Sequence, residues 1–523
     1  MATILDLPAE LTEEIASYLL PCTVEAFAIA CKAIFLKCPY RDDLFYFLRQ
    51  ITKDPLAAEY VQSISLWDRR EKHEVMEARA RLSEELALWK SDEIVEQVLE
   101  YAIDQVGVFL EETNIFSVDE WKSELRIELL NLHGQDQQLH SRPVLFNSAT
   151  IFMLFPSLRV LKLNQSWSHT IRSRRGPSGR LKRRLIRLLD KLSDNAQEFT
   201  SERMDVAMKD SAVPPLQSKI SNARHATATA HVPYRPLAKL EYLDPCFPNH
   251  NSGLMPSMAA LDVFLRLPRL HTACVTSART TPTWIPTRFP LYAVYDPFHS
   301  IHLRRLEMTY TWGTIESIAA MLGRCHSLEV FKYHSEGHQM EANDFVEAIA
   351  NAVGRTLREL AIVGHFNRIP GDLAVTNLNE FILLEILEIN VELFFLVKTG
   401  ENDQHAECEN PLGHILCPSI RKLVLSCAPC EANFRGVKVL CNGLSEDRNK
   451  RLKSLESMVV HSSLHKDGEL GQEVQAIAEG QGVEWINVTP KELPKMGFLG
   501  DYEERFKGYM TYQDDLREDQ TDW

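Results

Sequence analysis

The chain has 523 residues, which is enough for about three domains of ordinary size. Its residues are 45% hydrophobic, 25% charged and 9% aromatic, a composition that excludes a wholly disordered or fibrous protein. Asp and Glu (72) outnumber Lys and Arg (57), and the resulting net charge of −15 disfavours binding to nucleic acid or to an anionic membrane.

Three features of the sequence concern the compartment. The first residues are acidic and lack a basic n-region, which is unlike a secretory signal peptide. The most apolar stretch, residues 381–397, is interrupted by Glu385, Glu388 and Glu392, so no transmembrane helix is predicted. Eleven cysteines, an odd number without a secretory signal, indicate reduced thiols. We therefore expect a cytoplasmic or nuclear protein that contacts no membrane.

Two short amphipathic helices are predicted at the N-terminus. Pro8 stands where a first helical turn tolerates proline, and the carboxylates behind it favour the positive end of a helix. Thr23 is the expected N-cap of the second helix. Apolar residues recur at helical spacing in both, at Leu11, Ile15, Tyr18 and Leu19 and then at Val24, Phe27, Ala28, Cys31, Ile34 and Phe35. Helices this short must bury their apolar faces against the chain itself or against a partner.

These N-terminal residues resemble an F-box of the form common in filamentous fungi. The elements that carry the resemblance are Leu7-Pro8-Ala9-Glu10-Leu11, Ile15, Leu19 and the run Ala26–Lys32, and they cover about forty residues. Phe27 departs from the pattern, which usually has a small aliphatic residue there. The resemblance implies binding to a Skp-type adaptor, and through it to cullin, by Leu7, Pro8, Leu11, Ile15, Leu19, Phe27, Ala28 and Cys31. The alternative is that the two helices only cap the domain behind them.

A second pattern, LxxLxL, recurs along the rest of the chain. It predicts strands within residues 60–67, 155–166, 236–245, 267–277, 302–311, 326–335, 356–365, 383–392, 419–427, 451–463 and 483–490. Helical spacers such as 314–325 and 343–355 separate the later strands. Units of strand, turn and helix cannot bury their apolar faces alone, so they stack. We interpret them as degenerate leucine-rich repeats with insertions.

The resulting fold class is α/β, with a short N-terminal helical F-box followed by a leucine-rich-repeat-like solenoid. Parallel strands are expected on its concave face and helices outside. The expected divisions are F-box-like helices at 1–40, a helical linker with the first repeat at 41–154, the solenoid at 155–500 with a basic, partly flexible insertion at 168–235, and an acidic tail at 501–523.

Repeat proteins bind partners through the exposed residues of the strand face. The leucines of the pattern are core residues, so the candidates are the side chains between them. They are Lys162, Glu307, Thr309, Tyr333, Glu359, Glu388, Lys422 and Ser426. Their mixed chemistry identifies no ligand.

The insertion contains one strongly basic run. Residues Arg172 to Lys191 include nine Lys and Arg against the single Asp190. Such a run serves as a nuclear-import signal or as a patch for an acidic partner. The alternative, which we favour, is an exposed insertion between two strands that ends in an amphipathic helix docked on the solenoid through Leu185, Leu188, Leu189 and Leu192.

Two groups of residues contain side chains of the types that bind metal ions. Cys427 and Cys430 form a CxxC, with His405, Cys408, His414, Cys417 and Cys441 nearby in sequence, but no second CxxC or finger-spaced histidine pair completes a zinc site. His334 and His338 are four residues apart, but Gly337 and the preceding strand predict a loop there and not a metal-binding helix. Phosphate-binding loops, nucleophile elbows and kinase motifs are missing from the sequence. We therefore expect no catalytic residue, no metal and no cofactor.

The resemblance implies a non-enzymatic substrate receptor of an SCF-type ubiquitin ligase. Its N-terminal helices hold the Skp adaptor, and its solenoid binds a protein target that the sequence does not identify. Two alternatives stay open. One is a repeat-based interaction scaffold that works without a ligase, and the other is an enzyme, which would need a cleft of perturbed titratable groups.

Overall fold

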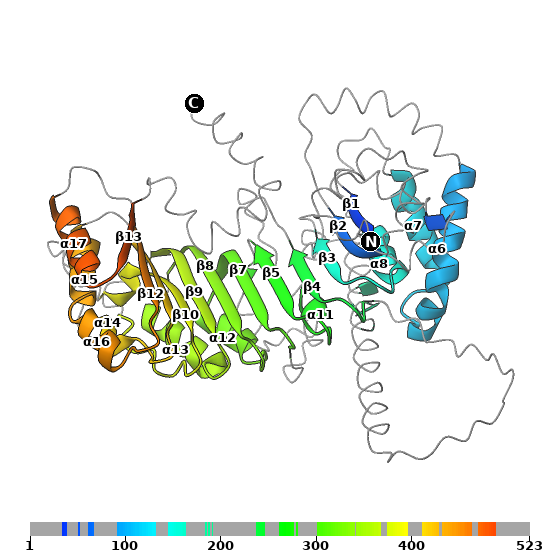
Figure 1. Ribbon diagram of the computed structural model, residues 1–523. Helices are drawn as coiled ribbons and strands as arrows, with labels where there is room; N and C mark the ends of the chain where they lie inside the picture. Colours follow the sequence, from blue (N-terminus) through cyan, green and yellow to red (C-terminus); the bar gives the residue numbers. More distant parts are fainter. Residues whose placement is uncertain are drawn as a thin grey trace, which may run out of the picture. The chain divides into compact units, whose positions relative to one another are not determined.

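The computed structural model describes residues 34–38, 51–52, 61–66, 92–131, 145–163, 184–185, 187–188, 191, 237–245, 261–276, 279–280, 301–339, 341–367, 374–395, 411–427, 431–462 and 469–487. The chain separates into two compact units. Unit 1 comprises Met1–Pro245 and Arg266–Leu270, and unit 2 comprises Cys246–Leu265 and His271–Trp523. Both are α/β, and the strand pairs described in each are parallel (Figure 1).

Unit 1 combines four strands with a group of helices. The strands β1 (Ile34–Cys38), β2 (Val61–Leu66), β3 (Val160–Leu163) and β4 (Tyr242–Pro245) are neighbours in that order. The helices α6 (Asp92–Thr113), α7 (Val118–Asn131) and α8 (Leu145–Leu154) pack together and confirm the helical prediction for this stretch. The buried Trp121 of α7 donates its indole N–H to Thr150 Oγ1 of α8 at 3.2 Å, which satisfies its one polar atom.

One prediction at the N-terminus is wrong. The sequence pattern predicts Ile34 and Phe35 on the apolar face of the second helix, but both belong to β1, which pairs in parallel with β2. Helical spacing within the sequence cannot report pairing with a strand more than twenty residues away. The preceding residues, and with them both predicted F-box helices up to residue 33, lie outside the described part of the chain.

Unit 2 contains the strand and helix repeats. Its strands follow the order β5, β7, β8, β9, β10, β11, β12 and β13, with β6 pairing to β7. In chain order its elements are α11 (Asp262–Leu265), β5 (Thr272–Thr276), β6 (Arg279–Thr280), β7 (Arg305–Gly313), α12 (Ile315–Leu322), β8 (Val330–Gln339), α13 (Ala342–Val353), β9 (Glu359–Asn367), β10 (Ile386–Asn390), the 3₁₀ turn η6 (Val391–Phe394), α14 (Leu412–Ile415), β11 (Lys422–Cys427), α15 (Glu431–Leu440), α16 (Leu444–Lys450), β12 (Ser457–Ser462), α17 (Glu469–Gly480) and β13 (Glu484–Asn487). A strand is present within every LxxLxL segment predicted from the sequence, including those of unit 1.

The apolar positions of the pattern form the core. In unit 2 the parallel register aligns the fourth position of successive repeats across the sheet, as Leu306, Phe331, Leu360, Leu387, Leu423 and Met458, all of them buried. Each buried side chain of this size contributes about 1.5–3 kcal/mol relative to exposure. This aligned row explains why so degenerate a repeat still gives regular parallel pairing.

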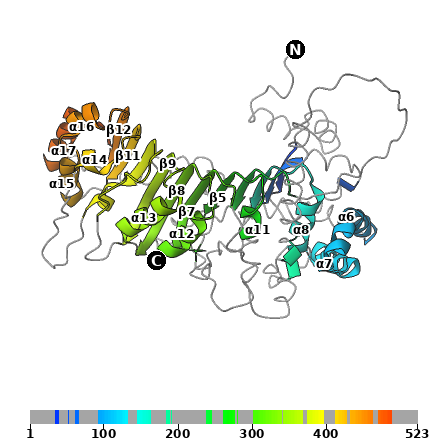
Figure 2. The same cartoon turned by 90° about the horizontal axis from the view of Figure 1, so that it is seen from below.

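Helices cover the side of the sheet that bears this core. Figures 1 and 2 show α12 and α13 along one face of β7 to β9. Thr314 caps α12 by accepting a hydrogen bond from the Ser317 N–H. On α13, the Phe345 ring lies 5.0 Å from the Tyr333 ring of β8, which places Tyr333 on the helix side.

A row of alternating charges lies where successive strands begin. The residues that directly precede the strands β7 to β12 are, in order, Arg304, Glu329, Arg358, Glu385, Arg421 and Glu456. From Glu329 onward, the backbone N–H of each residue in this row donates a hydrogen bond to the backbone carbonyl of the residue before it in the row. Arg358 pairs with Glu385 at 2.5 Å and Arg421 with Glu456 at 2.6 Å. We call this row the edge ladder, and its alternation favours the observed neighbours over a slipped register.

Candidate functional site

The side of the unit 2 strands opposite α12 and α13 is the polar face. Strand alternation places on it the residues between the core positions, among them Arg305, Glu307, Thr309, Lys332, His334, Glu359, Glu388, Asn390, Lys422, Ser426, His461 and Glu484. Of the sequence candidates in unit 2, which were expected to be exposed, Glu307, Thr309 and Glu388 lie on this face but are buried, and Tyr333 is misplaced. It is fully buried on the helix side, where its hydroxyl donates to the Thr311 carbonyl at 3.2 Å and burial raises the pKa of the phenol. Lys162 is on β3 in unit 1 and half-buried.

The charges on β7 to β9 pair with one another. The guanidinium of Arg305 donates from Nε to Glu307 Oε1 at 2.6 Å, and it lies 4.0 Å from Glu359. Lys332 forms an ion pair with Glu359. Glu307 is fully buried, and its second oxygen accepts from the Cys274 thiol at 3.5 Å. We call these residues the paired cluster. Because the carboxylate of Glu307 is held by a cation and by a thiol, its burial is compensated within the chain.

Asn390, the last residue of β10, joins that strand to β9. Its amide donates to the Gly364 carbonyl at 2.8 Å and accepts from the Gly364 N–H at 3.3 Å. Gly364 has φ +113°, and a Cβ there would lie 2.2 Å from the Ser335 carbonyl oxygen of β8. The side chain of Asn390 therefore continues the backbone ladder where a glycine lets β9 approach β8.

The charges on β11 to β13 are not paired in this way. Lys422 and Glu484 are exposed, and neither forms an ion pair with a described residue. His461 is on β12, the strand between theirs, level with Ser426 and Ile486; it is only 8% exposed, and its Nδ1 has no hydrogen-bond partner among the described residues. Burial lowers the pKa of His461, the charge of Lys422 lowers it further, and Glu484 opposes the shift. Lys422, Ser426, His461 and Glu484 are called the unpaired patch.

The cysteines of the candidate zinc site are core residues where they are described. Cys427, Cys417 and Cys441 are buried and form no disulfide. Burial raises the pKa of Cys441 to about 12, as it does that of Cys325, so these thiols are protonated at neutral pH. Within the described ranges, no group of three His, Cys, Asp or Glu side chains is placed to hold a metal ion. Cys430, His405 and Cys408 lie outside those ranges.

The histidine pair is part of a strand. The loop predicted for His334 to His338 is wrong, because β8 continues through both residues to Gln339. Its pairing with β9 is irregular between Glu336 and His338, so a bulge and not a turn accommodates Gly337.

The basic run ends in a docked segment of unit 1. Leu185 and Leu188 are buried, as predicted, whereas Leu189 and Leu192 are outside the described residues. Arg184 donates to the Ile115 carbonyl at 2.8 Å and to Glu120 Oε2 at 2.7 Å, and its guanidinium lies 4.2 Å from the centre of the Phe116 ring. At this position the run is therefore anchored at the corner between α6 and α7.

The adaptor-binding candidates all precede residue 34. Leu7, Pro8, Leu11, Ile15, Leu19, Phe27, Ala28 and Cys31 therefore lie outside the described residues. In the part of the chain that is described, no helix has both the length and the apolar character needed to cross a membrane.

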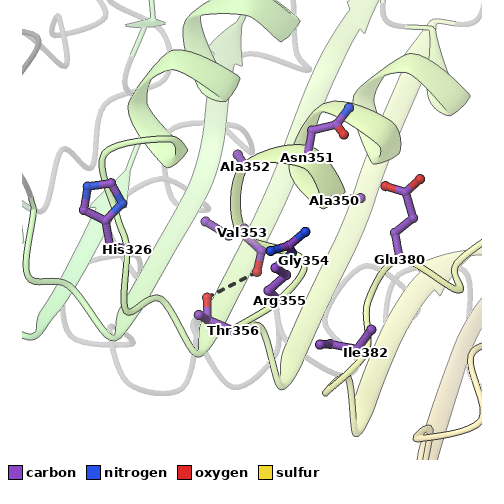
Figure 3. A pocket seen from close by; sticks show the side chains of 10 residues that line it. All are labelled: His326, Ala350, Asn351, Ala352, Val353, Gly354, Arg355, Thr356, Glu380 and Ile382. Carbon is purple, nitrogen blue, oxygen red and sulfur yellow. Dashed lines mark hydrogen bonds between the residues drawn. The ribbon is translucent and has the colours of Figure 1, made fainter.

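A surface hollow of about 610 Å³ adjoins the end of α13 (Figure 3). Its charged residues do not converge, since His326 and Glu380 lie on opposite sides of it. The Val353 carbonyl that faces it already accepts from the Thr356 hydroxyl at 3.2 Å. The hollow is therefore a weaker candidate than the polar face.

The chain matches no family model, no curated protein and no solved structure. Its functional assignment consequently depends on the motif and on the polar face alone.

Sequence reasoning missed several members of the polar face. Arg305, Lys332, Asn390, His461 and Glu484 occupy positions that alternate with the core leucines. Numbering every repeat from its first apolar residue would have identified them. Their partners, however, depend on the register between strands.

Proposed function

We propose that this chain is the substrate-recognition subunit of an SCF-type ubiquitin ligase, an F-box protein with degenerate leucine-rich repeats. In this proposal Leu7, Pro8, Leu11, Ile15, Leu19, Phe27, Ala28 and Cys31 contact a Skp-type adaptor that links the chain to cullin. The polar face of the repeats contacts the protein target. The protein works in the cytoplasm or the nucleus.

The observation that carries the proposal is the N-terminal motif followed by the stacked repeats. Leu7-Pro8, Ile15 and Leu19 precede the run Ala26–Lys32 at F-box spacing. An array of parallel strands with a polar face follows, and repeat arrays of this kind present extended binding surfaces. Neither feature alone would distinguish a ligase subunit from another repeat protein.

The chemistry of such a receptor is positioning. The chain contributes no nucleophile, and it raises the effective concentration of a target lysine near a ubiquitin carrier. The buried, protonated thiols of Cys325 and Cys441 are unsuited to covalent transfer and are consistent with this role.

The alternative is a repeat scaffold that acts without a ligase. Strand β1 begins at Ile34, directly after the motif, and pairs with β2. A motif joined so closely to a sheet favours helices that cap unit 1, and this observation supports the alternative.

Co-purification tests the proposal. The full chain is co-expressed with a Skp-type adaptor, beside a Leu7→Asp, Ile15→Asp variant and a Leu185→Asp variant as control for a disturbed unit 1. We expect the wild type to retain the adaptor and the N-terminal variant to lose it while keeping its circular dichroism spectrum. If the folded wild type does not bind, or if the folded N-terminal variant binds as well as the wild type, the assignment of the N-terminal motif to adaptor binding is wrong.

A further inference from the structure

The turn before β10 departs from the pattern of the other repeats. The Leu384 N–H closes it by donating to the Phe381 carbonyl at 3.3 Å. The two residues between them, Ile382 and Leu383, are 59% and 41% exposed. Turns closed by the same bond precede other strands, and there the two central residues are small, polar or proline. These pairs are Pro156-Ser157, Ala238-Lys239, Pro268-Arg269, His326-Ser327, Pro418-Ser419 and Lys453-Ser454. Two large apolar residues exposed side by side, at turn positions that such residues rarely occupy, indicate a binding surface.

A recess adjoins this exposed pair. Ile382 is one of the residues that line the hollow of about 610 Å³ at the end of α13 (Figure 3). No helix corresponding to α12 or α13 occurs within residues 374–385, which lead into β10. A Cβ at Gly354 would lie 3.1 Å from the Glu380 carbonyl oxygen, so the end of α13 and the residues before the turn are in close contact. An exposed apolar side chain beside a preformed recess is a shape that fits a second copy of itself.

The charges of the hollow have the same property. Arg355 and Glu380 both line it and are exposed, and neither forms an ion pair with a described residue. Figure 3 shows His326 on one side, Glu380 and Ile382 on the other, and Arg355 between them. Because the two charges are opposite and separate, a two-fold axis allows Arg355 of each copy to meet Glu380 of the other.

The edge ladder is also complementary to itself. From β7 to β12 it reads Arg, Glu, Arg, Glu, Arg, Glu. An alternating row with an even number of members, when reversed by a two-fold axis, places an arginine opposite every glutamate. Arg304 and Glu329, which have no ion pair with a described residue, then face the last glutamate and the last arginine of the second copy. The axis passes the midpoint of the row, between Arg358 and Glu385.

The midpoint of the edge ladder coincides with the hollow. Arg358 and Glu385 directly precede β9 and β10, and the hollow is lined by the turns before those same two strands. The apolar pair and the ladder are separate features of the sequence, one from a single repeat and one from six. Both nevertheless place a two-fold axis between β9 and β10.

We propose that the edge at which the unit 2 strands begin joins two copies of the chain in a symmetric dimer, with Ile382 of each copy in the hollow of the other. Stable interfaces bury about 800 Å² per partner, and exposed ion pairs add little. An interface with one small apolar centre and a rim of such pairs is therefore weak, with a dissociation constant on the order of micromolar. The inference goes beyond the proposed function and does not depend on it.

Sedimentation velocity of the full chain, from about 1 to 100 μM, tests the dimer. We expect a reversible shift from monomer to dimer across this range. Ile382→Asp weakens the dimer on the order of a hundredfold, because a symmetric interface loses the contact twice. Leu383→Ser gives the turn the serine of its neighbours and weakens the dimer about tenfold. Val108→Asp, at an exposed apolar residue of α6 in unit 1, changes nothing.

Charge reversal tests the symmetry. Arg355→Glu places two glutamates opposite each other at two points of the dimer, and Glu380→Arg does the same with two arginines. Each variant alone should weaken the dimer about tenfold or more. An equimolar mixture of the two should dimerise as the wild type does, because every arginine again faces a glutamate. The double variant should also dimerise.

Three results would overturn the inference. The first is a folded wild-type chain that stays monomeric over the whole range, which leaves the exposed turn to a different partner. The second is a dimer that neither Ile382→Asp nor Leu383→Ser weakens. The third is a mixture of the two charge variants that remains monomeric. Circular dichroism shows that each variant is folded, and adaptor co-purification, measured separately, decides the proposed function alone.

Discussion

Two regions of the same polar face differ in whether their charged side chains form ion pairs with one another. On β7 to β9, Arg305, Glu307, Lys332 and Glu359 compensate one another, and the most buried of them is fully enclosed. On β11 and β13, Lys422 and Glu484 remain exposed, and His461 on the strand between them has an Nδ1 without a partner among the described residues. The difference teaches that equivalent strand positions of a repeat array can hold compensated charges in one part and exposed charges without ion pairs to described residues in another.

Removing a cation from the paired cluster should have the largest effect. Arg305→Ala leaves the buried carboxylate of Glu307 without its principal counter-charge, which costs about 3 kcal/mol of unfolding free energy. Urea denaturation measures the loss. The matched change in the unpaired patch, Lys422→Ala, should stay within about 0.5 kcal/mol.

A double substitution sharpens this test. Arg305→Met with Glu307→Leu removes both charges, so it should recover most of the stability lost by Arg305→Ala. Equal losses for Arg305→Ala and Lys422→Ala would contradict the contrast between the two regions.

Removing the side-chain amide of Asn390 should cause the second largest loss of unfolding free energy. Asn390→Ala removes both hydrogen bonds to Gly364, and we expect a loss of about 1–2 kcal/mol in the same denaturation experiment. Asn442, exposed in the turn after α15, is the control for a generic asparagine deletion. An unchanged midpoint for Asn390→Ala would show that the bridge between β9 and β10 is not needed.

The unpaired patch should make stability depend on pH. The pKa of His461 is lowered from 6.5 in the folded chain, so the unfolded chain binds this proton more readily. The neutral histidine therefore favours folding above pH 6.5, and this contribution is lost as the pH falls below that value. Denaturation between about pH 7.5 and 5 should give a shallower dependence for His461→Asn than for the wild type. Identical pH profiles would mean that His461 is solvated like a surface histidine.

The ion pairs of the edge ladder should contribute least to the stability of the fold. Arg358 and Glu385 are 2.5 Å apart but largely exposed, so their coupling in a double-mutant cycle is expected at about 0.3–1 kcal/mol. High salt should reduce it. A coupling that salt does not change would show a desolvated pair, unlike the exposed one described.

The fold of unit 2 could be predicted because LxxLxL is a local signal with a fixed spacing. The same rule would have placed Tyr333 correctly, since it follows Leu328 and Phe331 in the position that Met308 and Ile362 occupy in neighbouring repeats. β1 could not be predicted from spacing, because Ile34 and Phe35 fit a helix equally well and only β2 makes them a strand.

The candidate site was predictable only in part. Glu307, Glu359 and Lys422 were identified as members of the strand face, but their roles were not. Arg305 and Glu307 pair within one strand, whereas Lys332 reaches Glu359 on the next. Which charges find partners is decided by register and by side-chain reach, and no residue pattern within one repeat contains that information.

The most direct test of the account is a calorimetric titration of the purified full chain with a Skp-type adaptor. Three proteins are compared: the wild type, Leu7→Asp with Ile15→Asp, and Lys422→Gln with His461→Asn. The account predicts equal adaptor affinity for the wild type and the patch variant and no binding for the N-terminal variant. Absence of binding by the folded wild-type chain would contradict the assignment as a ligase receptor.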